Sequence, residues 1–216
     1  LNMPKILLET ITLKDDEEHH RGIIHIACLM VQHNSLRPKF MSPKKIQSFA
    51  AFIDSKSNIV KTEAMNFVSL VLEEKTKTFL FPVFERCLKV LKEPFQIITS
   101  FIIACFDFII KMSYMRVKAS DAGEFQFFEV VMKLLAQFPN HSQLMLQISK
   151  YVKVSLYDKS IFPDIILVLI PGLIEFASYE DHTASHIMCM ILLDDVQKEY
   201  GNTKEFKEIM SKSYAN

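Results

Sequence analysis

Apolar side chains recur three and four positions apart along almost the whole chain, and strict alternation of apolar and polar positions is scarce. A spacing of i, i+3, i+4 and i+7 places apolar residues on one face of an α-helix. Ile46, Phe49, Ala50 and Ile53 form one such stripe. The pattern therefore predicts an all-α protein of about ten helices.

The predicted helices fall into antiparallel pairs, because short polar or proline-containing linkers separate them. Helices are expected at 3–13 and 20–33, then as pairs at 43–53 and 58–74, 78–92 and 94–117, 123–138 and 141–157, and 163–177 and 180–200, with a last helix at 203–214. Ser42 and Pro43 form a typical helix start, with a capping residue before a proline in the first turn. Pair starts at 43, 78, 123 and 163 give a period of roughly 35 to 45 residues, which is typical of two-helix repeats.

One pair carries a family signature. In the segment 40–72, an apolar first helix is followed by Asp54 in the turn and then by Val60-Lys61 and Ala64 on the second helix. This segment resembles a HEAT or armadillo-type repeat, although Lys61 stands where arginine is usual and the turn is about one residue longer than the commonest spacing. Later pairs share the two-helix outline and not the signature. The resemblance implies a right-handed α-α superhelix, a HEAT/armadillo-like stack of antiparallel helix pairs; the alternative fold is a closed helical bundle.

Length and composition restrict the domain organisation and the possible functions of the protein. At 216 residues the chain is expected to form a single α-helical repeat domain over 1–216, as a fragment or subunit of something larger. Its 25 basic and 25 acidic residues balance, so a dedicated nucleic-acid binder is not expected. Four glycines and no GxGxxG or GxxxxGK[ST] argue against a phosphate-cradling loop, and no cofactor is predicted.

The four cysteines each lie among apolar residues, with no CxxC motif, which predicts reduced core thiols and an intracellular location in cytoplasm or nucleus. Two apolar stretches, 95–110 and 161–177, resemble membrane spans. The first is short and contains Asp107, and the second contains Asp164, Pro171 and Glu175, which are costly in lipid. Both are predicted to be buried core helices, and no membrane span is expected.

His182, His186 and Cys189 stand at i, i+4 and i+7 on one predicted helix and are residue types that bind zinc. A structural zinc needs a fourth ligand, which no motif supplies. The same face continues into Met190, Leu193 and Val196, so the simpler interpretation is a core stripe with a buried histidine and thiol. These three residues are the weak metal candidates of the chain.

Catalytic groups are not evident. Asp107 lies within an apolar run and needs a partner or access to water, and Lys111 follows it at the favourable i+4 position. No nucleophile motif occurs, and no companion for a general acid is visible. The sequence predicts a protein without enzymatic activity.

Four basic residues, Arg37, Lys39, Lys44 and Lys45, lie close together around two prolines in a predicted inter-helix segment. The simple interpretation is a solvated loop. The alternative function is a phosphate- or nucleic-acid-binding helical-repeat module that uses this segment.

The HEAT/armadillo resemblance implies a binding face lined by the second helix of each pair. Polar positions off the apolar stripes are the candidate partner-binding residues, namely Lys61, Asn66, Asp107, Lys111, Gln147 and Lys150. The predicted function is a protein-binding scaffold or adaptor, a subunit of a larger complex that holds protein partners.

Overall fold

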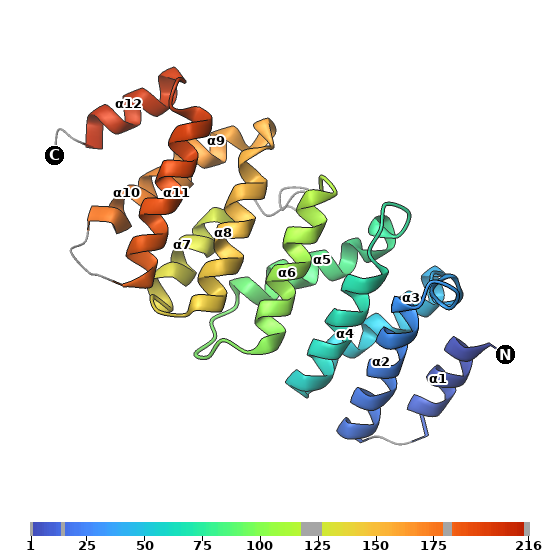
Figure 1. Ribbon diagram of the computed structural model, residues 1–216. Coiled ribbons are helices and arrows are strands. Elements are labelled where there is room, and N and C mark those ends of the chain that lie inside the picture. The colour runs from blue at the N-terminus through green and yellow to red at the C-terminus, as the bar shows by residue number, and fades with distance from the viewer. Residues whose placement is uncertain (1, 14–15, 118–126, 179–182, 214–216) are drawn as a thin grey trace. The chain divides into compact units, whose positions relative to one another are not determined.

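A computed structural model of the chain describes residues 2–13, 16–117, 127–178 and 183–213, and within those ranges it contains helices and turns but no strand (Figure 1). The chain divides into two compact units, Leu1–Met115 and Arg116–Asn216, and each is described by itself. The single domain over 1–216 stays a prediction.

The first unit consists of helix pairs. Its elements are α1 (Met3–Ile11), α2 (Glu17–Gln32), the 3-10 turn η1 (Arg37–Lys39), α3 (Pro43–Ala50) continued by the 3-10 turn η2 (Ala51–Asp54), α4 (Asn58–Val71), α5 (Lys77–Lys92) and α6 (Ser100–Tyr114). α1 packs on α2, α3 on α4, and α5 on α6. α4 also lies between α2 and α6, so the second helices of the three pairs form a row (Figure 1).

The second unit repeats this plan. Its elements are α7 (Phe127–Gln137), α8 (Ser142–Leu156), the 3-10 turn η4 (Lys159–Ile161), α9 (Phe162–Asp164), the π-helical turn η5 (Ile165–Leu169), α10 (Ile170–Ser178), α11 (Ala184–Tyr200) and α12 (Lys204–Ser213). α10 packs on α11, and α11 lies beside α8. α8 and α11 are therefore the second helices of this unit.

Each second helix begins at a residue whose side chain accepts a hydrogen bond from the first helical turn. The caps are Asp16, Ser57, Thr99, His141 and Thr183. Such a bond satisfies one of the backbone N–H groups that have no partner inside the helix. The caps fix where these helices start.

Two sequence predictions at helix starts were wrong in detail. α6 begins at Ser100 and not at residue 94, because Thr99 caps it through the N–H of Ile102 at 3.4 Å. Ser42 does precede α3 as predicted, with Pro43 in the first turn, but its side chain makes no capping hydrogen bond. Pro43, as the first helical residue, removes one of the N–H groups that have no partner inside the helix, but not those of Lys44 and Lys45, from which a Ser42 cap would accept.

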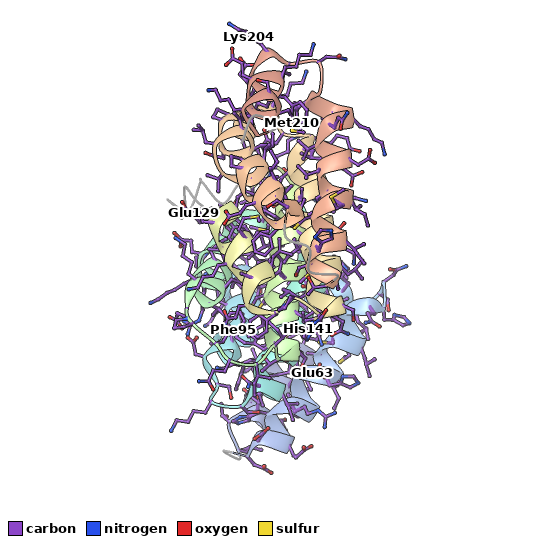
Figure 2. The ribbon with its side chains drawn as sticks, turned by 90° about the vertical axis from the view of Figure 1, so that its left-hand side faces the viewer. Glu63, Phe95, Glu129, His141, Lys204 and Met210 are labelled. Carbon is purple, nitrogen blue, oxygen red and sulfur yellow. The ribbon has the colours of Figure 1, made fainter. Side chains whose placement is uncertain are left out.

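The core of the first unit is aromatic and aliphatic. Phe40, Phe49 and Phe67 are fully buried, with ring centroids 4.6 Å apart between Phe49 and Phe67 and 6.2 Å between Phe40 and Phe67. Side chains fill the space between the helices of each unit (Figure 2). The apolar residues of the repeat signature are buried, as the helical spacing predicts; they are Ile46, Ile53, Val60 and Ala64.

The π-helical turn η5 stands directly before Pro171. Its wider ring is closed by the N–H of Ile170, which donates to the carbonyl of Ile165. Proline has no N–H to offer the carbonyl four residues earlier, so a regular α-helix would be interrupted at this point. Gly172 follows, and a Cβ there would lie 2.9 Å from the Met132 side chain, so glycine lets α7 and α10 approach closely.

By length and composition, one helical stretch among the described residues, Lys159–Ser178, could cross a membrane. A single stretch of this kind is weak evidence for a span, because core helices pass the same test. The prediction that residues 161–177 form a buried helix is only partly correct. Only 22% of the most apolar window of this stretch is buried, and Leu167 is 73% exposed, so one apolar side faces outward.

Candidate functional site: a polar groove on the second helices of the first unit

The row of second helices α2, α4 and α6 carries a groove with a volume of about 300 Å³. Apolar wall positions come from Leu29, Leu70 and Ala104. Its polar lining residues are His25, Cys28 and Gln32 from α2, Glu63, Asn66 and Ser69 from α4, and Asp107 and Lys111 from α6.

Helical spacing explains why each helix contributes these residues. Glu63, Asn66 and Leu70 lie at i, i+3 and i+7, and Asp107 and Lys111 lie at i and i+4, so each set shares one face. The opposite faces of α4 and α6 carry Met65 and Ile109, which are fully buried. The groove therefore lies on the side of the row that faces away from the core.

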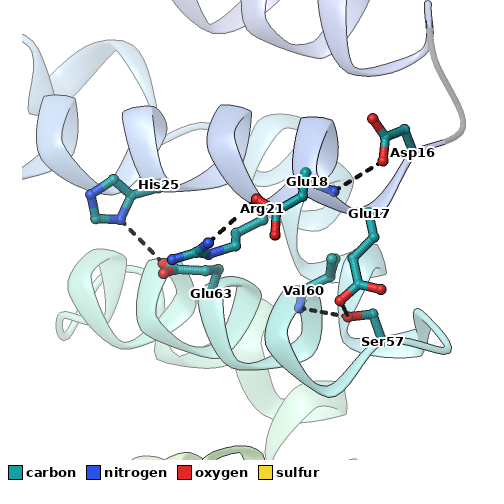
Figure 3. Close-up of polar contacts among 8 residues, drawn as sticks. All are labelled: Asp16, Glu17, Glu18, Arg21, His25, Ser57, Val60 and Glu63. Carbon is teal, nitrogen blue, oxygen red and sulfur yellow. Dashed lines mark hydrogen bonds and ion pairs between the residues drawn. The ribbon is translucent and has the colours of Figure 1, made fainter.

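Several charges of the groove are already paired. Lys111 contacts Asp107 with 2.6 Å between Nζ and Oδ2, as the i, i+4 spacing predicted. His25 reaches across from α2 to Glu63 on α4, with 3.5 Å between Nδ1 and Oε2 (Figure 3). At the start of the same two helices Ser57 donates a hydrogen bond to Glu17 (Figure 3). The last two contacts join α2 to α4 along the groove.

The amides of the groove differ from its charged groups. Among the described residues, the side chains of Gln32 and Asn66 have no hydrogen-bond partner, and both are exposed. A primary amide offers both a donor and an acceptor, which matches the N–H and C=O of an extended peptide. The arrangement therefore offers hydrogen bonds to a peptide backbone beside apolar wall positions.

The structure gathers only half of the predicted partner-binding residues in this groove, namely Asn66, Asp107 and Lys111. Lys61 lies elsewhere, with Nζ 5.3 Å from the centre of the Phe101 ring, in a cation-π contact between α4 and α6. In the second unit Gln147 is 8% exposed, and Lys150 is exposed. Sequence reasoning missed His25 and Glu63, although Glu63 lies three positions before Asn66.

Two residues of the basic segment 37–45 make polar contacts within the first unit. Arg37 contacts Glu73 with 3.4 Å between Nη2 and Oε2, and the Lys45 ammonium donates to the carbonyl of Lys39 at 2.7 Å. Lys39 and Lys44 lie in η1 and α3. The phosphate- or nucleic-acid-binding alternative stays a prediction.

Of the three weak metal candidates the structure describes two, His186 and Cys189, since His182 lies outside the described residues. Cys189 is buried, as a core thiol would be, and burial raises its pKa to about 12. His186 is half-buried, and its Nδ1 has no hydrogen-bond partner. Within the described ranges no three His, Cys, Asp or Glu side chains gather as a metal site would require. Met190, predicted on the core stripe, is 52% exposed, because the buried face of α11 is formed by Ser185, Cys189, Leu192 and Val196 and does not include it.

Together these features define a class: stacked antiparallel helix pairs whose second helices present a groove. The structure is similar to a designed armadillo repeat protein in complex with the peptide (KR)4, with a TM-score of 0.66 and 12% sequence identity over 88% of this chain and 80% of that chain. No protein-family model matches the sequence, and a search of curated proteins gives no match. The likeness confirms the predicted all-α, armadillo-like superhelical repeat fold in place of the closed bundle.

Proposed function

We propose that this chain is a protein-binding scaffold without a chemical step, which holds an extended segment of a partner protein in the groove over α2, α4 and α6. The observation that carries the proposal is the pair of unpartnered amides, Gln32 and Asn66, inside a groove whose charged groups are mostly paired with one another. The two amides exchange hydrogen bonds to water for bonds to the backbone of the partner, at a net gain of about 1 kcal/mol for each bond.

The chemistry of the groove also suggests which segments it prefers. Glu63 and Asp107 supply two carboxylates against one lysine and one histidine, so the groove favours a neutral or basic segment over an acidic one. The designed armadillo protein with the same fold was determined with a basic peptide, (KR)4. That fold supports the use of stacked helix pairs as a peptide-holding surface.

A role as subunit of a larger intracellular complex is part of the proposal. Repeat proteins of this kind bind by surface complementarity, and their partners are other protein chains. All four cysteines are free and buried, which supports a reducing compartment.

Affinity capture from a cell extract with three forms of the chain tests the proposal. Asn66→Arg fills the groove with a long charged side chain, and Gln47→Arg makes the same type of change at an exposed position of α3, away from the groove. We expect one protein to be enriched by the native chain and by Gln47→Arg and lost with Asn66→Arg. A synthetic peptide from that protein should then bind the native chain in a fluorescence anisotropy titration.

Two results would contradict the proposal. One is the absence of any enriched protein. The other is a partner that Asn66→Arg retains, since Asn66 lies within the groove and is exposed, so its replacement changes binding without disturbing the core.

A further inference from the structure

The second helices of the second unit carry a surface of a different kind. Leu146 on α8 and Ile187, Met190 and Ile191 on α11 are 52%, 57%, 52% and 45% exposed. We name these four residues the aliphatic patch. In the first unit the corresponding helices carry the polar groove residues beside exposed apolar side chains such as Leu29.

Contacts between α8 and α11 set the direction and register of the two helices. The Ser185 hydroxyl lies 3.6 Å from the Met145 sulfur, near the start of both helices, and Tyr200 donates to the carbonyl of Leu156 at their ends. The two helices are therefore parallel and aligned, with Leu146 one residue after Met145 and Ile187 two residues after Ser185.

The orientation of α11 follows from its helical spacing. Ser185, Cys189, Leu192 and Val196 are buried and share one face. Ile187 and Ile191, one turn apart, point to the opposite face. Large apolar side chains that gather on one exposed face mark interaction surfaces more often than scattered ones do.

Two acidic residues of α11 near the patch are paired with lysines. Asp194 pairs with Lys198, and Asp195 pairs with Lys153 at 3.3 Å. Lys150, one turn beyond Leu146 on the same face of α8, is exposed and has no partner among the described residues. Among the residues that the structure describes at this surface, the charge left for a partner is therefore positive.

We propose that the aliphatic patch and Lys150 dock an amphipathic helix of a partner protein, one that presents aliphatic side chains one turn apart with a carboxylate beside them. The patch extends over two neighbouring helices and about one turn along them, which is the footprint of two or three side chains of a helix packed on the exposed faces of α8 and α11. The carboxylate neutralises Lys150. This surface acts independently of the polar groove of the first unit.

Display selection tests this inference on the full chain. A library of random peptides about 16 residues long, long enough for four helical turns, is selected on the native protein, and the enriched peptides are titrated as synthetic probes. Ile191→Asp places a charge in the patch, whereas Leu167→Asp makes the same change at an apolar side chain of η5 that is 73% exposed. Both positions face solvent, and circular dichroism verifies that each variant is folded.

We expect enriched peptides with aliphatic residues at i and i+3 or i+4 and an Asp or Glu close by. Ile191→Asp should weaken their binding by on the order of tenfold or more, as expected for a residue at the centre of an interface, and Leu167→Asp should leave it unchanged. Lys150→Glu should weaken binding, and peptides with lysine in place of the acidic residue should recover it.

Other outcomes would overturn the inference. These are a selection without enrichment, enriched peptides that bind Ile191→Asp as well as the native chain, and a preference for basic peptides. A dimer in analytical ultracentrifugation that Ile191→Asp dissolves would show that a second copy covers the patch. Asn66→Arg distinguishes the patch from the proposed groove. This variant should lose the partner that binds the groove and still bind the selected peptides at the patch, so the two proposals can fail separately.

Discussion

The hydroxyl of Tyr200, at the last residue of α11, donates a 2.6 Å hydrogen bond to the backbone carbonyl of Leu156, the last residue of α8. The Tyr200 side chain is buried, and its ring lies 4.8 Å from that of Phe162. The bond satisfies one of the carbonyls that have no partner within the end of a helix. It therefore joins the two second helices of the unit at their carboxyl ends.

Tyr200→Phe should lower the free energy of unfolding by about 1 to 2 kcal/mol, because it leaves the Leu156 carbonyl buried without that donor while keeping the ring. Urea unfolding followed by circular dichroism measures the change. Tyr157→Phe is the matched control, since Tyr157 is 81% exposed, and its effect should stay within about 0.5 kcal/mol. Equal effects of both substitutions would show that the hydrogen bond contributes nothing.

The Asp54 carboxylate of the repeat signature pairs with Arg86 of α5 and so connects two helix pairs. Both side chains are about half exposed, at 55% and 50%. Exposed ion pairs contribute little, so a double-mutant cycle with Asp54→Ala and Arg86→Ala should give a coupling free energy of about 0.2 to 1 kcal/mol. A coupling of several kcal/mol would mean that the signature residue is a main source of stability.

Gly22→Ala should stabilise the protein by about 0.5 to 1 kcal/mol, because Gly22 lies inside α2 and a Cβ there meets no atom within 4 Å. Thermal unfolding measures the gain. Gly172→Ala is the counterpart inside α10, where the new Cβ would lie 2.9 Å from the Met132 side chain. Gly172→Ala should therefore stabilise the protein less than Gly22→Ala does, or destabilise it. An equal increase in stability for both variants would contradict the close packing of α7 on α10.

Burial raises the pKa of the Cys28 thiol from its ordinary value of 9.0 to about 12, with the nearby Glu63 carboxylate adding to the shift, and burial does the same for Cys189. Unfolded thiols ionise near pH 9 while the folded ones stay neutral. Their contribution to stability is therefore complete below pH 9 and is lost as the pH rises from about 9 to 12.

Urea midpoints of the native chain should thus fall more steeply above pH 9 than those of the double variant Cys28→Ala/Cys189→Ala. Lysine and tyrosine titrate in the same range in both proteins, so the difference between the two slopes isolates the thiols. Parallel slopes would show that the two thiols ionise alike in the folded and unfolded chains.

Local features were predicted well from the sequence. The helix pairs, the buried positions Ile46 and Ala64, and the Asp107–Lys111 pair all depend on spacings within one helix, which the helical period fixes. The start of α6 was misplaced because Thr99 and Pro94 both offer a boundary, and the cap at Thr99 prevailed. Met190 was misassigned to the core because the rotation of α11 depends on its neighbours α8 and α10.

The sequence by itself determined the fold class, since the apolar period, the repeat length and the signature around Asp54 all favour stacked helix pairs. It also supplied Asn66, Asp107 and Lys111 as polar positions on second helices. Only the tertiary structure decided that His25 and Glu63 join them in one groove, and that Leu146 and Ile187 form one patch. The physical reason is that the helical period relates residues of one helix, whereas contacts between helices depend on their packing, to which side chains from the whole unit contribute.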